Sequence, residues 1–314
     1  MNILFCGDTF PAAREYLRER LPAQDHLDIW SKGDLNSQVA DADVVIPLMH
    51  RIDAGVMESG RFRLVQQWGS GLEGVDLDAA RRRGIWVSNV PHSEANAESV
   101  AEHAILLMLC LLRNLRQAES NIQSGILGAP VGRTLFGRTV CLYGLGGIAA
   151  SLARRLRPLG ARIVGLTRDP RAPKVAAFHL DECYATSEWY RCLAQADILT
   201  ICLRLSDATR NMIGAKELTC LPAGALLVNV ARGGIVDYGA LYAALSTGHL
   251  AGAGLDVYWQ EPICPDDPIL KLPNVIATPH IAGVTDRSYT EIANVVAGNI
   301  ERLRRGEPPI HLAT

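Results

Sequence analysis

A glycine-rich turn between an apolar run and a helical pattern constrains the fold of this chain more than any other feature. Residues 140–143 form a short apolar run, the turn Gly144-Leu145-Gly146-Gly147-Ile148-Ala149 follows directly, and residues 151–156 have helical spacing. A strand, a turn of the form G-x-G-x-x-(G/A) and a helix are typical of a βαβ unit that binds a dinucleotide pyrophosphate at the helix N-terminus. An ordinary glycine-rich turn between a strand and a helix is the alternative, and motifs elsewhere in the chain are needed to distinguish the two.

Strand-like runs alternate with amphipathic, helix-length segments along the chain. The expected strands are residues 3–6, 44–48, 64–67, 140–143, 162–166, 198–203, 225–230, 254–257 and 275–277. Helical patterns cover residues 11–20, 76–83, 96–116, 151–156 and 289–305. Such alternation predicts βαβ units and parallel sheets covered by helices.

The length of 314 residues exceeds what one hydrophobic core usually supports, so two domains are expected. The long apolar pattern at 96–116 is expected to leave one domain and enter the other, and the last helix to return to the first. The predicted fold is α/β with two doubly wound parallel-sheet domains. A Rossmann dinucleotide-binding domain, residues 98–285, is inserted in a flavodoxin-like substrate domain, residues 1–97 plus 286–314.

Composition and charge exclude several classes of function. The net charge is −2, so no global positive field attracts nucleic acid or an anionic membrane surface. No window approaches the roughly 20 apolar residues of a membrane span, and the start lacks the basic region of a secretory signal, so a cytoplasmic location is expected. The eight cysteines include no C-x-x-C pair, so neither a disulfide framework nor a metal site is predicted.

Three segments at the ends of expected strands carry unusual polar residues: residues 229–234, 254–262 and 277–283. Open parallel sheets bind ligands beyond the carboxyl ends of their strands, so these segments should meet at the reacting end of the cofactor. Reduction of a keto acid needs a fixed cation and a proton donor, and Arg232 and His280 match those needs. Glu261 would hydrogen-bond the distal ring nitrogen of His280 and favour the imidazolium.

At these residues the chain resembles the D-isomer-specific 2-hydroxyacid dehydrogenase family. The resemblance implies hydride transfer between a nicotinamide cofactor and a small 2-keto or 2-hydroxy acid. Arg232 then orients the substrate, Glu261 and His280 form an acid/base relay, and Asp256 binds the nicotinamide carboxamide. Residues 69–76, with Ser70 and Gly71, resemble the family loop that grips the substrate carboxylate. Residues 96–103 resemble its interdomain helix, which implies a homodimer.

The predicted site thus has three groups of residues. The catalytic residues are Arg232, Glu261 and His280. The cofactor-binding residues are Gly144, Gly146, Gly147, Ile148, Thr167, Arg168, Leu203, Arg204, Val230, Ala231, Asp256 and Gly283. The substrate-binding residues are Ser70, Gly71, Arg232 and His280.

The end of the strand at 162–166 determines which nicotinamide cofactor is expected. An acidic residue there accepts hydrogen bonds from the ribose of NAD, but this chain has Thr167 and Arg168. Arg168 can pair with a 2′-phosphate, and Arg204 would supply a second cation. Residues 202–204 also stand where many family members have His-x-Pro. NADP is therefore the predicted cofactor, with NAD possible if Arg168 points to solvent or stacks on the adenine.

Other functions compatible with this architecture stay open. Formate and phosphite dehydrogenases share it, but the first have glutamine where Glu261 stands and the second have a lysine near Ser70 that is absent here. An NAD(H)-sensing corepressor is the alternative from another class. The expected side-chain pocket suits either a small keto acid such as glyoxylate or hydroxypyruvate or a bulkier aromatic one. Its residues are Met49, His50, Arg51, Trp68, Tyr258 and Trp259.

Overall fold

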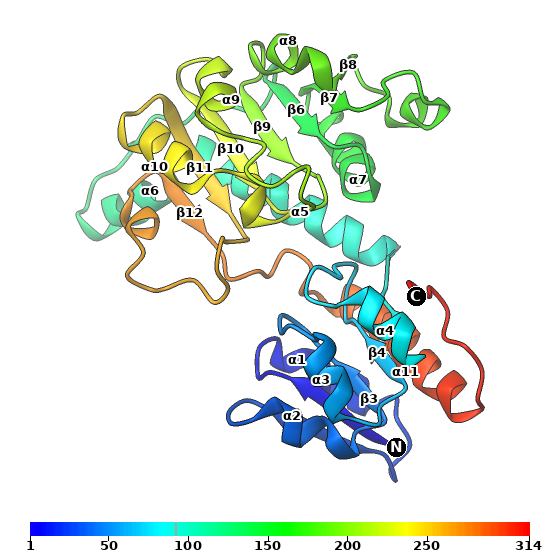
Figure 1. Cartoon of the computed structure of the whole chain (residues 1–314). Helices are drawn as coiled ribbons and strands as arrows, with labels where there is room; N and C mark the ends of the chain where they lie inside the picture. Colours follow the sequence, from blue (N-terminus) through cyan, green and yellow to red (C-terminus); the bar gives the residue numbers. More distant parts are fainter. Residues whose placement is uncertain (92) are drawn as a thin grey trace. The chain divides into compact units, whose positions relative to one another are not determined.

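The computed structural model describes residues 1–91 and 93–314, which divide into two compact units. The first unit comprises Met1–Asn96 and Thr285–Thr314, and the second comprises Ala97–Val284. The boundaries predicted from the sequence lie one residue away from these limits. Both units are built on parallel sheets with interspersed helices, so the predicted α/β class is confirmed. Figure 1 shows the first unit in blue, cyan and red and the second from cyan-green to orange.

The sheet of the first unit has five parallel strands in the order β2-β1-β3-β4-β5. The strands are β1 (Asn2–Cys6), β2 (His26–Trp30), β3 (Val44–Ile46), β4 (Leu64–Gln66) and β5 (Trp86–Ser88). The helices between them are α1 (Pro11–Arg18), α2 (Leu35–Gln38), α3 (Ala54–Ser59) and α4 (Leu77–Arg83). This strand order is that of flavodoxin-like folds. The sequence analysis missed β2, which is largely exposed, and β5, which is only three residues long.

The C-terminal helix α11 (Asp286–Arg304) belongs to this first unit. Its apolar side chains at positions 292, 296, 300 and 303 are buried, as their helical spacing predicts. The fully buried Asn299 donates from Nδ2 to Oε1 of Gln66 on β4 at 2.8 Å and to Oγ of Ser88 on β5 at 3.1 Å. These bonds attach the end of the chain to strands more than two hundred residues earlier.

The sheet of the second unit has seven parallel strands in the order β12-β11-β10-β9-β6-β7-β8. The strands are β6 (Thr139–Tyr143), β7 (Arg162–Thr167), β8 (Glu182–Ala185), β9 (Ile198–Ile201), β10 (Ala225–Asn229), β11 (Leu250–Leu255) and β12 (Val275–Ala277). Its principal helices are α7 (Gly147–Leu156), α8 (Trp189–Leu193), α9 (Ala215–Cys220) and α10 (Tyr238–Ser246). Six of the strands have the dinucleotide-binding order, and β12 extends it.

The sequence analysis misplaced one strand of this sheet and missed another. The sequence places a strand at 254–257, whereas β11 begins at Leu250 and ends at Leu255. The glycines of β11 weaken the apolar pattern that marks a strand in the sequence. They are needed for close packing, because a Cβ on Gly254 would lie 2.9 Å from Cβ of Leu107. The edge strand β8 was missed because its polar sequence lacks a buried face.

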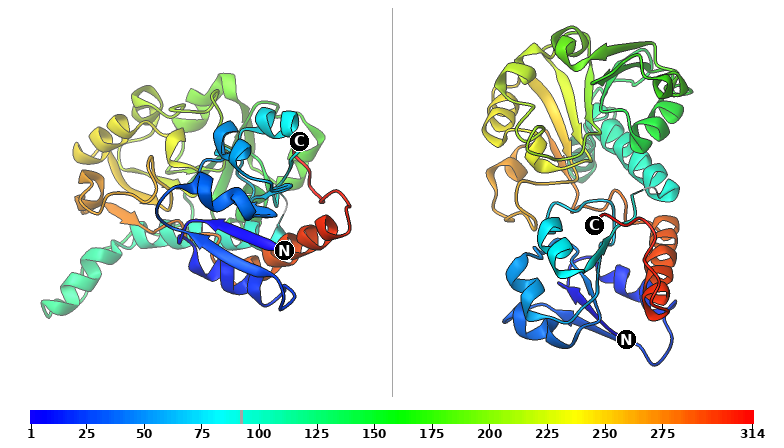
Figure 2. Two further views of the ribbon diagram at one scale, coloured as in Figure 1. Left: turned by 60° about the horizontal axis from the view of Figure 1, so that its bottom comes forward. Right: turned by 45° about the vertical axis from the view of Figure 1, so that its right-hand side comes forward.

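Helix α5 (Glu94–Leu112) runs from the first unit into the second and crosses the larger sheet, as Figure 2 shows. The predicted single helix to residue 116 ends early, because Asn114 adopts a left-handed conformation (φ 49°) before α6 (Leu115–Gln123) begins. By length and composition alone α5 is apolar enough to cross a membrane, contrary to the expectation from sequence. Half of its apolar window is buried, including Leu107 and Met108 in a core cluster.

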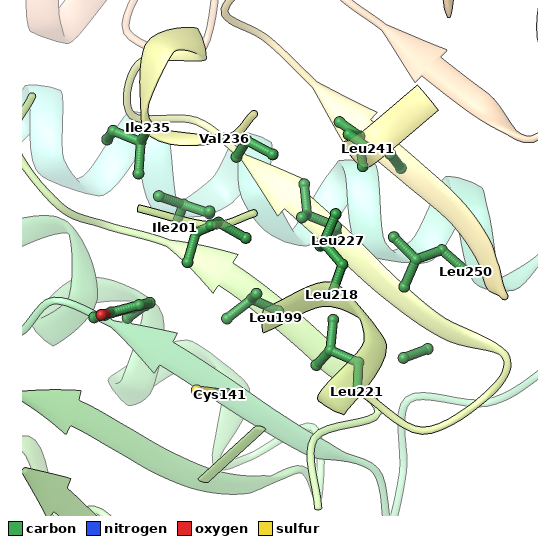
Figure 3. Packing of buried hydrophobic residues seen from close by; sticks show 14 of the residues in the cluster. Cys141, Leu199, Ile201, Leu218, Leu221, Leu227, Ile235, Val236, Leu241 and Leu250 are labelled. Carbon is green, nitrogen blue, oxygen red and sulfur yellow. The ribbon is translucent and has the colours of Figure 1, made fainter. Parts of the chain in front are cut away.

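The two faces of the larger sheet carry separate apolar clusters. Neighbouring residues on one strand point to opposite faces, so Leu199 and Leu227 join one cluster while Ile198 and Leu226 join the other. Figure 3 shows the first of these clusters, in which Leu199, Ile201 and Leu227 of the sheet gather with Leu218 of α9 and Leu241 of α10. Burial on both faces explains why these strands are continuous apolar runs in the sequence.

Candidate active site

The glycine-rich turn lies between β6 and α7, at the point where the strand order of the larger sheet reverses. Gly144 has φ 96°, and a Cβ there would lie 2.9 Å from the carbonyl oxygen of Cys202. A Cβ on Gly146, in contrast, would meet nothing within 4 Å. Among the described residues no side chain caps the N-terminus of α7, so its first amides have no partner from a capping side chain. The turn fits a pyrophosphate, with Ala149 completely buried where the helix meets the sheet.

The ends of β7 and β9 hold the side chains predicted to read the ribose. Thr167 is the half-buried last residue of β7, and Arg168 after it is exposed. Arg204 is also exposed, and the hydroxyl of Thr209 donates to its carbonyl oxygen at 2.8 Å. Within the described residues neither guanidinium makes a hydrogen bond or an ion pair. Leu203, between them in the predicted set, is apolar and packs against the glycine-rich turn. Its Cδ2 would lie 2.9 Å from a Cβ on Gly144.

Arg232 stands on a tight turn after β10. The side chain of Asn229 closes this turn, because Nδ2 donates to the carbonyl of Arg232 at 2.9 Å and Oδ1 accepts from the amide of Ala231 at 3.1 Å. Gly233 is required next to it, since a Cβ there would lie 2.1 Å from the carbonyl carbon of Tyr258. The predicted neighbours Val230 and Ala231 are buried beneath the turn and leave Arg232 half-buried.

His280 and Glu261 form a hydrogen-bonded pair. Nδ1 of His280 lies 2.6 Å from Oε2 of Glu261, and Oε1 of Glu261 accepts from the amide of Tyr258 at 2.8 Å. Burial raises the pKa of Glu261, but the hydrogen bond and charge of His280, with a smaller contribution from Arg232, hold it below its usual value. Glu261 is therefore the carboxylate partner of the His280 ring at Nδ1.

Asp256 is 1% exposed and holds the turn that carries His280. Its carboxylate accepts from the hydroxyl of Thr278 at 2.6 Å and from the amides of Ile281 and Ala282 at 2.8 and 2.9 Å. Its carbonyl accepts from the amide of His280 at 2.9 Å. The contacts of Asp256 within the protein are therefore structural, and the contact with the nicotinamide that the resemblance implies stays a prediction.

The remaining predicted residues lie in two places. Ile148 and Gly283 belong to the second unit, in α7 and in the segment before α11 respectively. Ser70 and Gly71 belong to the first unit, in the loop after β4. There Nδ2 of Asn89 donates to the carbonyl of Ser70 at 2.8 Å, and Ser70 itself is exposed.

The sequence analysis did not assign roles to the residues that shape the two catalytic turns. Asn229 closes the turn of Arg232, and Thr278 connects Asp256 to the turn of His280. The hydroxyl of Tyr258 donates to the carbonyl of Thr278 at 2.9 Å. A polar residue at the end of a buried strand was the available signal for Asn229. In the part of the chain that the structure describes, no three His, Cys, Asp or Glu side chains are placed to hold a metal ion.

Comparison with known proteins agrees with this geometry. The model of the NAD binding domain of the D-isomer specific 2-hydroxyacid dehydrogenases matches residues 105–282. A glyoxylate reductase from Korarchaeum cryptofilum is 36% identical over 300 residues, which cover 91% of this chain and 89% of the relative. A D-3-phosphoglycerate dehydrogenase from Archaeoglobus fulgidus is 34% identical over 312 residues; the match covers 98% of this chain but only 58% of that enzyme.

Among solved structures, an NADPH-dependent glyoxylate/hydroxypyruvate reductase from Sinorhizobium meliloti, in complex with NADP and malonate, is similar with a TM-score of 0.85. The two are 31% identical, and the similarity covers 100% of this chain and 96% of the other. The fold and site define a nicotinamide-dependent oxidoreductase. The chain belongs to the D-isomer specific 2-hydroxyacid dehydrogenase family, whose members act on 2-hydroxy and 2-keto acids.

Proposed function

We propose that the chain reduces small 2-keto acids, with Arg232 orienting the substrate and His280, supported by Glu261, delivering the proton. The observation that carries this assignment is the 2.6 Å contact between His280 and Glu261 at the end of β12, with Arg232 close enough to lower the pKa of the same carboxylate. A glyoxylate reductase among the relatives favours small substrates such as glyoxylate or hydroxypyruvate. The named relatives give no support to a corepressor function.

Each catalytic side chain has a chemical task that its surroundings permit. The guanidinium of Arg232 binds the carboxylate of the substrate and polarises its carbonyl. Imidazolium at His280 donates from Nε2 to the carbonyl oxygen, while Glu261 fixes Nδ1 as the other N–H. A bound nicotinamide dinucleotide supplies or accepts the hydride. For oxidation of the hydroxy acid, neutral His280 takes the proton back at Nε2.

A panel of 2-keto acids tests this function. The purified protein is incubated with glyoxylate, hydroxypyruvate, pyruvate and phenylpyruvate, each with NADH and NADPH, and oxidation of the reduced cofactor is followed by absorbance. Turnover of at least one small keto acid is expected, and the products of hydroxypyruvate, pyruvate or phenylpyruvate should have the D configuration; glycolate from glyoxylate has no stereocentre. Cofactor binding without turnover of any acid would instead support a nucleotide-sensing protein.

We also propose that NADPH is preferred to NADH. Two exposed guanidiniums, of Arg168 and Arg204, stand at the ends of β7 and β9, and Thr167 replaces the carboxylate that would repel a 2′-phosphate. The solved relative from Sinorhizobium meliloti is described as NADPH-dependent. The alternative, in which Arg168 stays in solvent, predicts equal use of both cofactors.

A double substitution tests the cofactor preference. Thr167→Asp with Arg168→Ala removes a phosphate contact and adds a repulsive carboxylate, so the ratio of NADPH to NADH affinity should fall about 100-fold. Arg82→Ala, which removes another exposed cation from α4 in the first unit, is the matched control and should leave the ratio unchanged. Equal affinity of the wild type for both cofactors would refute the proposal.

We further propose that the chain forms a homodimer through α6 and the segment after it. Figures 1 and 2 show α6 extending away from the larger sheet. Ile122, Leu127 and Val131 are 76%, 94% and 90% exposed, an apolar surface of the kind that marks an interface between chains. Light scattering should give the mass of two chains, and Leu127→Glu should shift it towards one; Leu159→Glu is the control. A monomeric wild type would refute the dimer.

A location in the cytoplasm stays a prediction, which cell fractionation would test.

A further inference from the structure

A second imidazole lies in the network behind His280, and the mechanism above does not use it. His103 is on α5, and its side chain is 11% exposed. Its Nε2 lies 2.9 Å from Oγ1 of Thr278, and that hydroxyl lies 2.6 Å from Oδ1 of Asp256. A chain of hydrogen bonds therefore runs from α5 through Thr278 to the carboxylate that holds the turn of His280.

The direction of these hydrogen bonds follows from the donors and acceptors available. The carboxylate of Asp256 accepts from two backbone amides, and it also accepts the single hydrogen of the Thr278 hydroxyl. Oγ1 of Thr278 must then act as the acceptor towards His103, so Nε2 of His103 carries the hydrogen. Burial lowers the pKa of His103, although the charge of Asp256 opposes this, and the neutral ring keeps one N–H for this bond.

The turn held in this way has an unfavourable backbone conformation. His280 has φ 56°, in the left-handed region that residues with a Cβ seldom adopt. Such a conformation persists only where surrounding contacts determine it. Here the amide of His280 donates to the carbonyls of Asp256 and Thr278 at 2.9 and 3.0 Å, and the Asp256 carboxylate fixes the next two amides. The direction of the His280 ring thus depends on Asp256 and Thr278 being held in place.

We propose that His103 is a positioning residue for the acid/base His280, acting through Thr278 and Asp256. By donating to Thr278, His103 orients the hydroxyl hydrogen towards Asp256 and anchors the turn at residues 278–282 to α5. The inference rests on the proposed role of His280. Loss of the donor should misplace the proton donor by a fraction of an ångström and lower kcat while substrate and cofactor still bind.

A set of variants separates this role from simple structural support. His103→Leu removes the donor, and His103→Gln restores an N–H near the position of Nε2. In keto-acid reduction we expect kcat to fall about tenfold in His103→Leu and to return to within about twofold of wild type in His103→Gln, with KM for both substrates nearly constant. Thr278→Val breaks the same chain, so the double variant His103→Leu/Thr278→Val should lose no more than Thr278→Val alone.

Control measurements keep the outcome decisive. Met108→Ala creates a cavity on the same helix without touching the hydrogen-bonded chain, so it should lower the melting temperature but leave kcat unchanged. Wild-type kcat in His103→Leu, additive losses in the double variant, or failure of glutamine to restore kcat would each overturn the positioning role. If the wild type reduces no keto acid, the proposed function fails instead, and the two failures are thereby distinguished.

Discussion

Glu98 on α5 connects that helix to α7, whose N-terminus belongs to the glycine-rich turn. Its carboxylate is bonded to Ser151, Arg154 and Arg155 of α7. Burial raises the pKa of Glu98, but the hydrogen bonds from these three residues and the charge of Arg155 lower it from 4.5 to about 2. One pKa unit corresponds to about 1.4 kcal/mol, so this lowering of the pKa sets an upper limit of about 3.5 kcal/mol on the contribution of the Glu98 charge to the free energy of unfolding. Because the ion pairs of Glu98 are partly solvated, we expect them to contribute about 1–2 kcal/mol to the free energy of unfolding.

The substitution Glu98→Gln tests this magnitude. The folded-state pKa is lowered, so the stabilisation is fully present above pH 4.5 and is lost as the pH falls towards 2. Urea unfolding at pH 7 should show a loss of about 1–2 kcal/mol, and the difference from wild type should shrink between pH 4.5 and the lowest pH at which the protein stays folded. Glu102→Gln is the control, because Glu102 is more exposed and bonds only Arg155. A loss that does not change with pH would show that packing, and not charge, is responsible.

Three further predictions concern the site itself. His280→Ala and Arg232→Ala should each lower kcat/KM for keto-acid reduction about 100-fold or more while circular dichroism still shows a folded protein; near-wild-type turnover would refute their roles. Glu261→Gln removes the carboxylate that holds Nδ1 of His280 at 2.6 Å, so reductive kcat/KM should fall at least about tenfold, and an unchanged kcat/KM would make Glu261 a structural residue. Gly144→Ala combines strain at φ 96° with a contact of 2.9 Å to Cys202, so cofactor affinity measured by calorimetry should fall at least about tenfold; unchanged affinity would show that the turn can move.

The proposed catalytic residues could be selected from the sequence because they follow strand ends. Parallel strands present their carboxyl ends at one edge of a sheet, so residues 232, 256 and 280, far apart in the chain, could be expected together. The order β12-β11-β10 puts their strands side by side. The contact of His280 with Glu261 at 2.6 Å follows from that arrangement.

By itself the sequence determined the alternation of strands and helices, the glycine-rich turn and the choice of candidate reacting side chains, because each depends on local spacing and residue chemistry. Only the tertiary structure decided which groups hold those side chains in place. His103 reaches Thr278 across 175 positions, and Asn299 reaches Gln66 across 233. No local pattern marks such pairs, since a buried polar residue finds its partner wherever the fold brings a complementary group within hydrogen-bond distance. For the same reason β11 was displaced in the prediction: its glycines are explained by the approach of α5, a helix that precedes it by more than a hundred residues.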